Sequence, residues 1–134
     1  EGNAVVQLPS LCAMTHTYQR GQQAERHAAA LLHQRGWMVL DRNWRCRWGE
    51  LDLVLVKDSR LLVVEVKGRS ARDRDRGGLD AFDICKRRRL ARAISCWRAD
   101  HPESEHQLLQ VVLALVPLNR RMAPVRWLAV DHLG

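Results

Sequence analysis

The sequence lacks long hydrophobic runs and paired cysteine motifs, and these two absences exclude the most classes of protein. None of its apolar stretches approaches the roughly 20 residues that a membrane-spanning helix needs, so we expect no membrane partner. Cys12, Cys46, Cys85 and Cys96 form no Cys-x-x-Cys pair, and the six histidines show no zinc-ligand spacing. We therefore expect the thiols to be reduced and the protein to be cytoplasmic.

Internal repeats, low-complexity tracts and a linker long enough to divide the chain are also missing. A length of 134 residues and 46% hydrophobic content predict one folded domain with a real core. The opening segment has no basic flank and is interrupted by Gln7 and Pro9, so it makes a poor signal peptide. We expect residues 1–18 to be a loosely ordered extension and residues 19–134 to be the single domain.

What the chain does have is excess positive charge, with 22 Lys and Arg against 15 Asp and Glu and a net charge of +7. Such a surface favours a polyanionic partner, of which nucleic acid is the commonest. Anionic membranes and plain solubility are the alternatives. Most of the cations are arginines, which suit bidentate contacts with phosphate.

Hydrophobic periodicity predicts an α/β domain in which helices cover a mixed sheet. Gly36 supplies a stop signal for the first helix, and the segment 68–78 has the composition of a charged loop. The predicted elements, in chain order, are a helix over 18–35, strands near 37–42, 50–56 and 61–67, a helix over 80–98, and strands near 108–116 and 125–131. A basic, tryptophan-rich connection is expected after the first strand.

Charged residues interrupt the two apolar strands over 50–56 and 61–67. If the four residues 57–60 form the connecting loop, Asp52 faces Glu65 and Glu50 faces Lys67 across the hairpin. Solvated strand-end charges would explain the pairing of Glu50 with Lys67. They would not explain two opposed carboxylates, which repel each other and raise each other's tendency to hold a proton.

A divalent cation between Asp52 and Glu65 would remove this repulsion. Carboxylate oxygens are hard ligands that suit Mg²⁺ or Mn²⁺, and these ions also coordinate phosphate oxygens and water. Strand alternation places Lys67 on the same face as both acids. A Glu-x-Lys triplet alone is frequent by chance, so the weight rests on the opposed acids.

The second predicted helix carries a lysine on its apolar stripe. Lys86 lies four residues after Phe82 and four before Leu90, which predicts an inward side chain with an anionic partner or one that snorkels past the helix edge. Arg87 is expected on a solvated basic face. In the first helix, the pattern alone favours a surface position for Glu25.

Four segments carry a resemblance to a known family. The stretches "GQQAERHAAALLHQRGW", "NWRCRWGELDLV", "VVEVKGRS" and "DICKRRRLARAI" cover residues 21 to about 97. In order and spacing they resemble the YraN-like family of uncharacterised bacterial proteins. The resemblance implies a restriction-endonuclease-like fold, an α/β domain with a central mixed five-stranded sheet, of the Pro-Asp…(Asp/Glu)-x-Lys superfamily.

The resemblance also implies site residues. The superfamily motif falls on Asp52, Glu65 and Lys67, with Leu51 at the motif's proline, and Glu25 matches a family glutamate of the first helix. Asp52, Glu65 and Glu25 are then the expected metal and catalytic carboxylates, and Lys67 positions the attacking water or stabilises charge at the phosphate. The expected nucleic-acid-binding residues are the phosphate-binding Lys86, together with Arg45, Arg47, Arg69, Arg89 and Trp44, with Trp48 as an alternative stacking residue.

The first hypothesis is thus an Mg²⁺- or Mn²⁺-dependent nuclease, or a nuclease-like DNA-processing protein, that hydrolyses phosphodiester bonds. Its substrate structure is left open, and a homo-oligomer is compatible with the sequence. The second hypothesis is a nucleic-acid-binding module that keeps the fold without turnover. The third is a structural or protein-interaction domain whose charges are simply solvated.

Overall fold

The structure is a computed structural model that describes residues 8–69, 82–118 and 123–133. Its order of elements matches the prediction of a helix, three strands, a helix and two strands. The bounds are α2 (Leu8–Gln34), β1 (Met38–Cys46), β2 (Gly49–Lys57), β3 (Arg60–Arg69), α3 (Ile84–Asp100), the short 3-10 helix η2 (Pro102–Ser104), β4 (Leu108–Pro117) and β5 (Arg126–Ala129).

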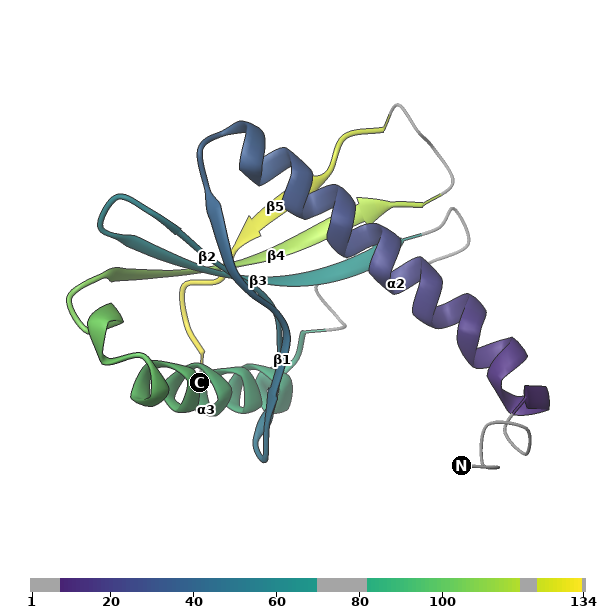
Figure 1. Cartoon of the computed structure of the whole chain (residues 1–134), viewed down its shortest axis with the longest axis horizontal. Coiled ribbons are helices and arrows are strands. Elements are labelled where there is room, and N and C mark those ends of the chain that lie inside the picture. Colours follow the sequence, from purple (N-terminus) through teal and green to yellow (C-terminus); the bar gives the residue numbers. More distant parts are fainter. Residues whose placement is uncertain (1–7, 70–81, 119–122, 134) are drawn as a thin grey trace.

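The five strands form one sheet in the order β1-β2-β3-β4-β5. Strands β3 and β4 are parallel, whereas the other neighbouring pairs are antiparallel. A parallel pair needs a crossover connection, and α3 lies on the one between β3 and β4. The mixed sheet and its two flanking helices (Figure 1) confirm the predicted α/β class and are consistent with a restriction-endonuclease-like fold.

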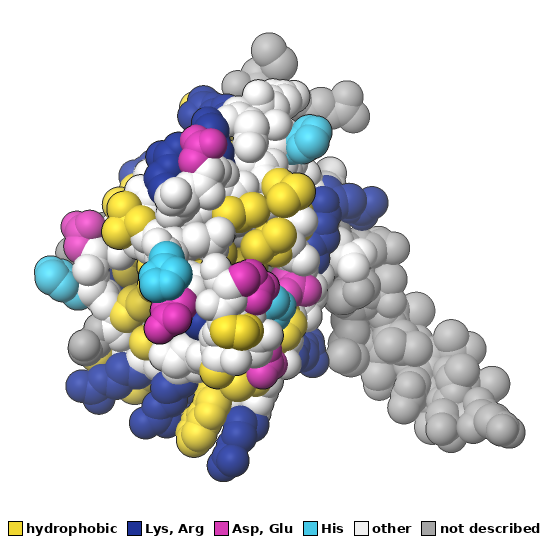
Figure 2. Space-filling view, turned by 60° about the vertical axis from the view of Figure 1, so that its left-hand side comes forward, with side chains coloured by type: hydrophobic (Ala, Val, Ile, Leu, Met, Phe, Trp, Pro, Cys, Tyr) yellow, Lys and Arg dark blue, Asp and Glu magenta, His cyan; other side chains and the backbone are white. Residues whose placement is uncertain are grey.

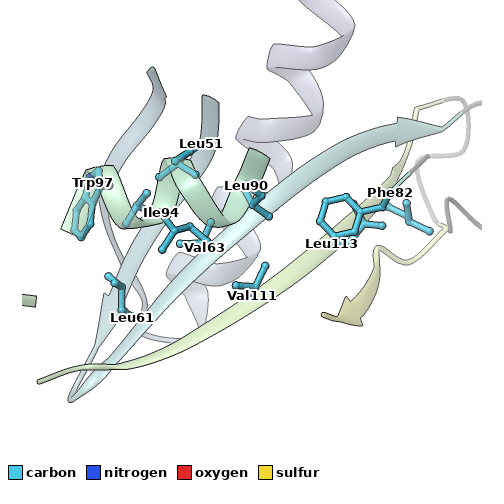
Figure 3. Packing of buried hydrophobic residues seen from close by; sticks show 12 residues of the cluster. Leu51, Leu61, Val63, Phe82, Leu90, Ile94, Trp97, Val111 and Leu113 are labelled. Carbon is cyan, nitrogen blue, oxygen red and sulfur yellow. The ribbon is translucent and has the colours of Figure 1, made fainter. Parts of the chain in front are cut away.

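Two hydrophobic layers hold the helices against opposite faces of the sheet. On one face, Leu90, Ile94 and Trp97 of α3 pack on Leu61 and Val63, as Figure 3 shows. The layer on the other face joins α2 to the sheet and consists of Ala24, Ala28, Ala29, Leu32, Trp37, Leu53, Leu55, Leu62, Val64, Ala114 and Val116. Strand alternation supplies both layers, because β2 and β3 present apolar side chains to each side.

Helix α2 begins at Leu8, ten residues before the start predicted at Tyr18. The prediction took residues 1–18 as a loosely ordered extension. Pro9 does not prevent the earlier start, because proline is compatible with the first turn of a helix, where its missing N–H has no helical partner anyway. The predicted stop is confirmed. Gly36 adopts a φ of 92°, and Lys57 Nζ donates to the carbonyl oxygen of Arg35 at 2.6 Å just beyond the helix end.

Other element ends differ from the prediction for local reasons. Strand β1 continues to Cys46, so the tryptophan-rich segment is mostly strand rather than connection. Lys57 pairs with Arg60 in the ladder, which leaves a two-residue turn in place of the predicted four-residue loop. Asp58 takes the left-handed conformation there, with a φ of 55°.

Helix α3 begins at Ile84, where the side chain of Asp83 caps it by accepting from the Lys86 N–H at 3.0 Å. The predicted start near residue 80 and most of the predicted charged loop lie outside the described residues. In the part of the chain that the structure describes, no helix has both the length and the apolar character needed to cross a membrane.

Candidate active site

The β2–β3 hairpin positions the two acids singled out in the sequence. Its register pairs Val54 with Val63 and Val56 with Leu61, as predicted. The hydrogen-bonded ladder ends at the next pair out, Leu53 with Val64. Asp52 and Glu65 therefore lie at the point where the backbone ladder between the two strands stops.

Strand β2 loses its regular alternation at Asp52. Leu51 packs in the α3-side core, whereas Leu53 packs in the α2-side core, although residues two apart normally share a face. On the neighbouring strand, Asn43 lies between the residues that pair with Leu51 and Leu53 and has a φ of 50°. We attribute the change of face to this irregularity, which asparagine tolerates better than most residues.

The irregularity accompanies an inward Asp52. The residue is only 8% exposed, and its Oδ2 accepts a hydrogen bond from the Val66 N–H of β3 at 2.8 Å. A side chain thus bonds β3 at the place where the backbone ladder has ended. Burial, followed by the nearby charge of Glu65, raises the pKa of Asp52 from 3.8 to about 9.

Glu65 is the hydrogen-bonded partner of Asp52. Burial is the main cause that raises its pKa from 4.5 to about 7, and the charge of Glu50 adds to it. The hydrogen bond from Asp52 and the charges of Lys86 and Lys67 act in the opposite direction. Near neutral pH the metal-free pair therefore holds a proton between its two carboxyl groups.

A cavity of about 260 Å³ opens beside this pair, between the ends of β2 and β3 and the start of α3. It brings together one acid and three cations of the predicted set, which are Glu65, Lys67, Lys86 and Arg89. Its remaining lining residues are Gly49, Glu50, Phe82, Leu90 and Leu113. A second, larger cavity of about 730 Å³ lies between α2 and β1 and contains none of the predicted catalytic residues.

Lys86 is exposed, which agrees with the alternative of a lysine that extends past the helix edge rather than with a buried one. Phe82 precedes the helix, and the four-residue spacing from it therefore has no helical meaning. Arg87 is instead the half-buried neighbour, because its Nε donates to the Phe82 carbonyl oxygen at 3.1 Å. Lys86 still lines the cavity, with its charge acting on Glu65.

Glu25 approaches the site from α2, on the other face of the sheet. It is half-buried and hydrogen-bonded to the Asn43 side chain, whereas the pattern alone favoured a surface position. Burial raises its pKa, and the charge of Glu50 contributes in the same direction. The charge of Glu25 also acts on Asp52, so the predicted acids share one electrostatic environment.

The arrangement of these carboxylates decides which metal ion they can hold. Among the described residues, no group of three or more His, Cys, Asp and Glu side chains is arranged to hold one. Glu25 is thus not gathered with Asp52 and Glu65 into a ready ligand set. The adjacent carboxyl groups of Asp52 and Glu65 nevertheless fit Mg²⁺, which commonly takes one or two carboxylates and fills its other positions with water and substrate phosphate.

A basic surface surrounds the turn between β1 and β2. Trp48 is 40% exposed, and the guanidinium carbons of Arg47 and Arg92 lie 4.6 and 4.9 Å from its ring centroid. Arg45 is exposed but forms a 2.8 Å ion pair with Glu50. In Figure 2, Lys and Arg side chains project from the lower edge of the molecule, the side on which α3 lies in Figure 1.

The two predicted stacking tryptophans occupy different environments. Trp44 packs against the α3-side core, so Trp48 is the one that meets solvent. Arg89 lines the cavity, and the half-buried Arg69 is the last residue of β3. Sequence reasoning missed two contributors, Asn43 beside Glu25 and Arg92 beside Trp48. An asparagine inside a strand was the available signal for the first.

Comparisons with known proteins find one matching family model and several similar relatives. The model of the uncharacterised protein family UPF0102 matches residues 24–116, a range that contains every predicted site residue. A UPF0102 protein of Synechococcus sp. (strain CC9902) is 65% identical over 121 residues, which cover 90% of this chain and all of that protein. Another, from Parasynechococcus marenigrum (strain WH8102), is 54% identical over 113 residues, covering 84% of this chain and 82% of the relative.

Proposed function

Since this chain belongs to the uncharacterised protein family UPF0102, the YraN-like family, whose name assigns no reaction, we propose a function from the chemistry of the site. The protein is a metal-dependent nuclease that hydrolyses phosphodiester bonds in DNA. The observation that carries this proposal is the hydrogen-bonded pair of the buried Asp52 and the half-buried Glu65, beside a cavity lined by Glu65, Lys67 and Lys86.

The electrostatic state of the pair supports this role. A strand end that only needed solubility would leave its acids in water, where two carboxylates repel each other little. Here burial raises the pKa of both acids, so the metal-free site binds a proton that a divalent cation would displace. Asp52 and Glu65 would hold Mg²⁺ or Mn²⁺, which when bound polarises a phosphate oxygen and lowers the pKa of a water ligand.

The other residues have separable tasks around this pair. Lys67 and Lys86 lie in the same cavity as Glu65 and supply positive charge where a scissile phosphate would lie. The Val66 N–H fixes one oxygen of Asp52, so the orientation of that carboxylate is set by the backbone of β3. Glu25 is hydrogen-bonded to Asn43 on the α2 side of the sheet. Its charge raises the pKa of Asp52, so its task is electrostatic.

DNA would reach the cavity across the basic surface. Arg89 lines the cavity itself, while Arg47 and Arg92 lie over Trp48 at the neighbouring turn. Guanidinium groups held against a ring are partly ordered before binding, which suits contacts with phosphates. This surface is also the observation that favours the second candidate function, a nucleic-acid-binding module without turnover, because its contacts do not depend on the carboxylate pair.

A cleavage panel tests the proposal. Labelled duplex, single-stranded and branched DNA are incubated with the full chain in EDTA, Mg²⁺ or Mn²⁺, and binding to the same DNAs is measured in parallel. The nuclease proposal expects cleavage of at least one DNA form with either metal and none in EDTA. Binding without cleavage in every condition would favour the binding module. The absence of both binding and cleavage would refute both proposals.

A further inference from the structure

Two free cysteines far apart in sequence meet where β1 lies against α3. Cys46 is the last residue of β1, and Cys96 lies in the last two turns of α3. Their thiols are hydrogen-bonded to each other, and both residues are only partly exposed. The third described cysteine, Cys85, is exposed in the first turn of α3.

Contacts on either side of the pair fix this juxtaposition. Toward the C-terminal end of α3, Trp97 Nε1 donates to Asp41 Oδ2 of β1 at 2.7 Å. One helical turn before Cys96, Arg92 lies over Trp48 with 4.9 Å between its guanidinium carbon and the ring centroid. Because α3 is tied to β1 at one of these points and to the β1–β2 turn at the other, the fold holds the two hydrogen-bonded thiols next to each other.

We propose that Cys46 and Cys96 form a reversible dithiol–disulfide site that locks the β1–β2 turn onto α3. The co-reactant is a low-molecular-weight disulfide of the glutathione type. This site is independent of the nuclease proposal, because its chemistry requires neither DNA nor a metal ion.

The reaction is thiol–disulfide exchange in two steps. The thiolate of Cys46 attacks one sulfur of the small disulfide, expels one thiolate that takes up a proton, and leaves a mixed disulfide on the protein. Cys96, after losing its proton, attacks the Cys46 sulfur, forms the Cys46–Cys96 bond and expels the second small thiol. Two protein thiols are oxidised, and one small disulfide is reduced to two thiols.

The surroundings assign the attacking and resolving roles. The sulfur of Cys46 lies at the end of β1 beside the exposed turn, where it accepts a hydrogen bond from the Trp48 N–H at 3.4 Å. The hydrogen bond with Cys46, followed by burial, raises the pKa of Cys96. Cys96 is therefore the poorer first nucleophile and the better placed resolving thiol.

The bond would act on one wall of the candidate active site. Gly49 lines the cavity and sits against α3, since a Cβ built on it would lie 3.6 Å from the Arg89 carbonyl oxygen. The same turn carries Trp48, part of the basic surface. A covalent tie from Cys46 to Cys96 would fix the separation of this turn from the helix.

The test follows thiol pairing in the purified full chain. The protein is equilibrated in glutathione buffers from reducing to oxidising, free thiols are alkylated, and peptides are mapped by mass spectrometry. We expect Cys46 and Cys96 to be oxidised together in one intramolecular bond, and the oxidised protein to melt roughly 5–10 °C higher than the reduced one. Cys85→Ser should leave both results unchanged.

Single substitutions separate the two roles. Cys96→Ser should trap a glutathione mixed disulfide on Cys46, whereas Cys46→Ser should leave Cys96 largely as a free thiol. Serine differs from cysteine by one atom, and a thermal melt of each reduced variant confirms that it is folded. Glutathione found separately on both cysteines of the wild type, or Cys46 bonded to Cys85 or Cys12 instead, would overturn the proposal.

Discussion

Replacing Asp52 with asparagine isolates the electrostatics of the site in the metal-free protein. Asparagine keeps an oxygen for the Val66 N–H and offers an amide N–H to Glu65, so it reproduces the protonated form of Asp52. In the wild type, the pKa of Asp52 rises from 3.8 to about 9 and that of Glu65 from 4.5 to about 7. The folded protein thus binds protons that the unfolded chain releases.

This difference sets the direction of the pH dependence. Below about pH 4 both states are protonated and the raised pKa values cost nothing. As the pH rises through the window between the unfolded and the folded pKa values, the unfolded chain loses its protons first. The free energy of unfolding then falls by about 1.4 kcal/mol per pH unit for each extra proton. At pH 7 one such proton lowers the free energy of unfolding by at most about 4 kcal/mol. Water at the strand ends screens the charges and makes the actual loss smaller.

We therefore expect Asp52→Asn to raise the free energy of unfolding by about 1–3 kcal/mol at pH 7 in EDTA, a gain that shrinks toward pH 4. Urea melts at several pH values measure it, with Glu105→Gln as a control at an exposed acid that follows η2, beyond the C-terminal end of α3. A variant less stable than the wild type at pH 7, with an unchanged pH slope, would refute the reasoning.

Three further outcomes concern the basic surface. DNA affinity should fall with salt, with a log–log slope of about −0.9 per neutralised phosphate, and a flat response in titrations would contradict an electrostatic interface. Trp48→Ala should weaken DNA binding by about 1–2 kcal/mol by releasing Arg47 and Arg92, and unchanged affinity would show that their placement is immaterial. Lys86→Ala should lower the cleavage rate more than Arg88→Ala, because Arg88 is exposed and does not line the cavity. Equal rates for the two variants would show that Lys86 contributes only to the general positive charge of the surface.

The hairpin could be predicted from the sequence because its pattern leaves one consistent register. Two apolar strands and a short polar break fix the pairing of Val54 with Val63, since a shift by one residue would turn every apolar side chain to the other face. The opposed acids followed from that register. They indicated a binding site because two like charges that face each other are destabilising unless a partner of opposite charge compensates them.

The remainder depended on irregularities that no periodic pattern encodes. The change of face between Leu51 and Leu53 accompanies the left-handed conformation of Asn43. It also accounts for the inward Asp52, whose side chain accepts a hydrogen bond from the Val66 N–H of β3. The exposure of Lys86 could not be decided from its spacing to Leu90, because Lys86 lies in the first turn of α3, directly after the Asp83 cap. The side on which Glu25 lies depends on how α2 crosses the sheet, a tertiary property.

The measurement that tests the central claim most directly is the single-turnover rate of cleavage of a bound DNA in Mg²⁺ or Mn²⁺. Wild type, Asp52→Asn and Glu65→Gln are compared at saturating protein, with Glu105→Gln as the control and with DNA binding measured on the same samples. The account predicts that both site variants bind DNA normally but cleave at least about 100-fold more slowly, while the control cleaves like the wild type. Equal cleavage by the wild type and the Glu65→Gln variant, or a wild type that binds DNA and never cuts it, would contradict the assignment of this carboxylate pair as the catalytic centre.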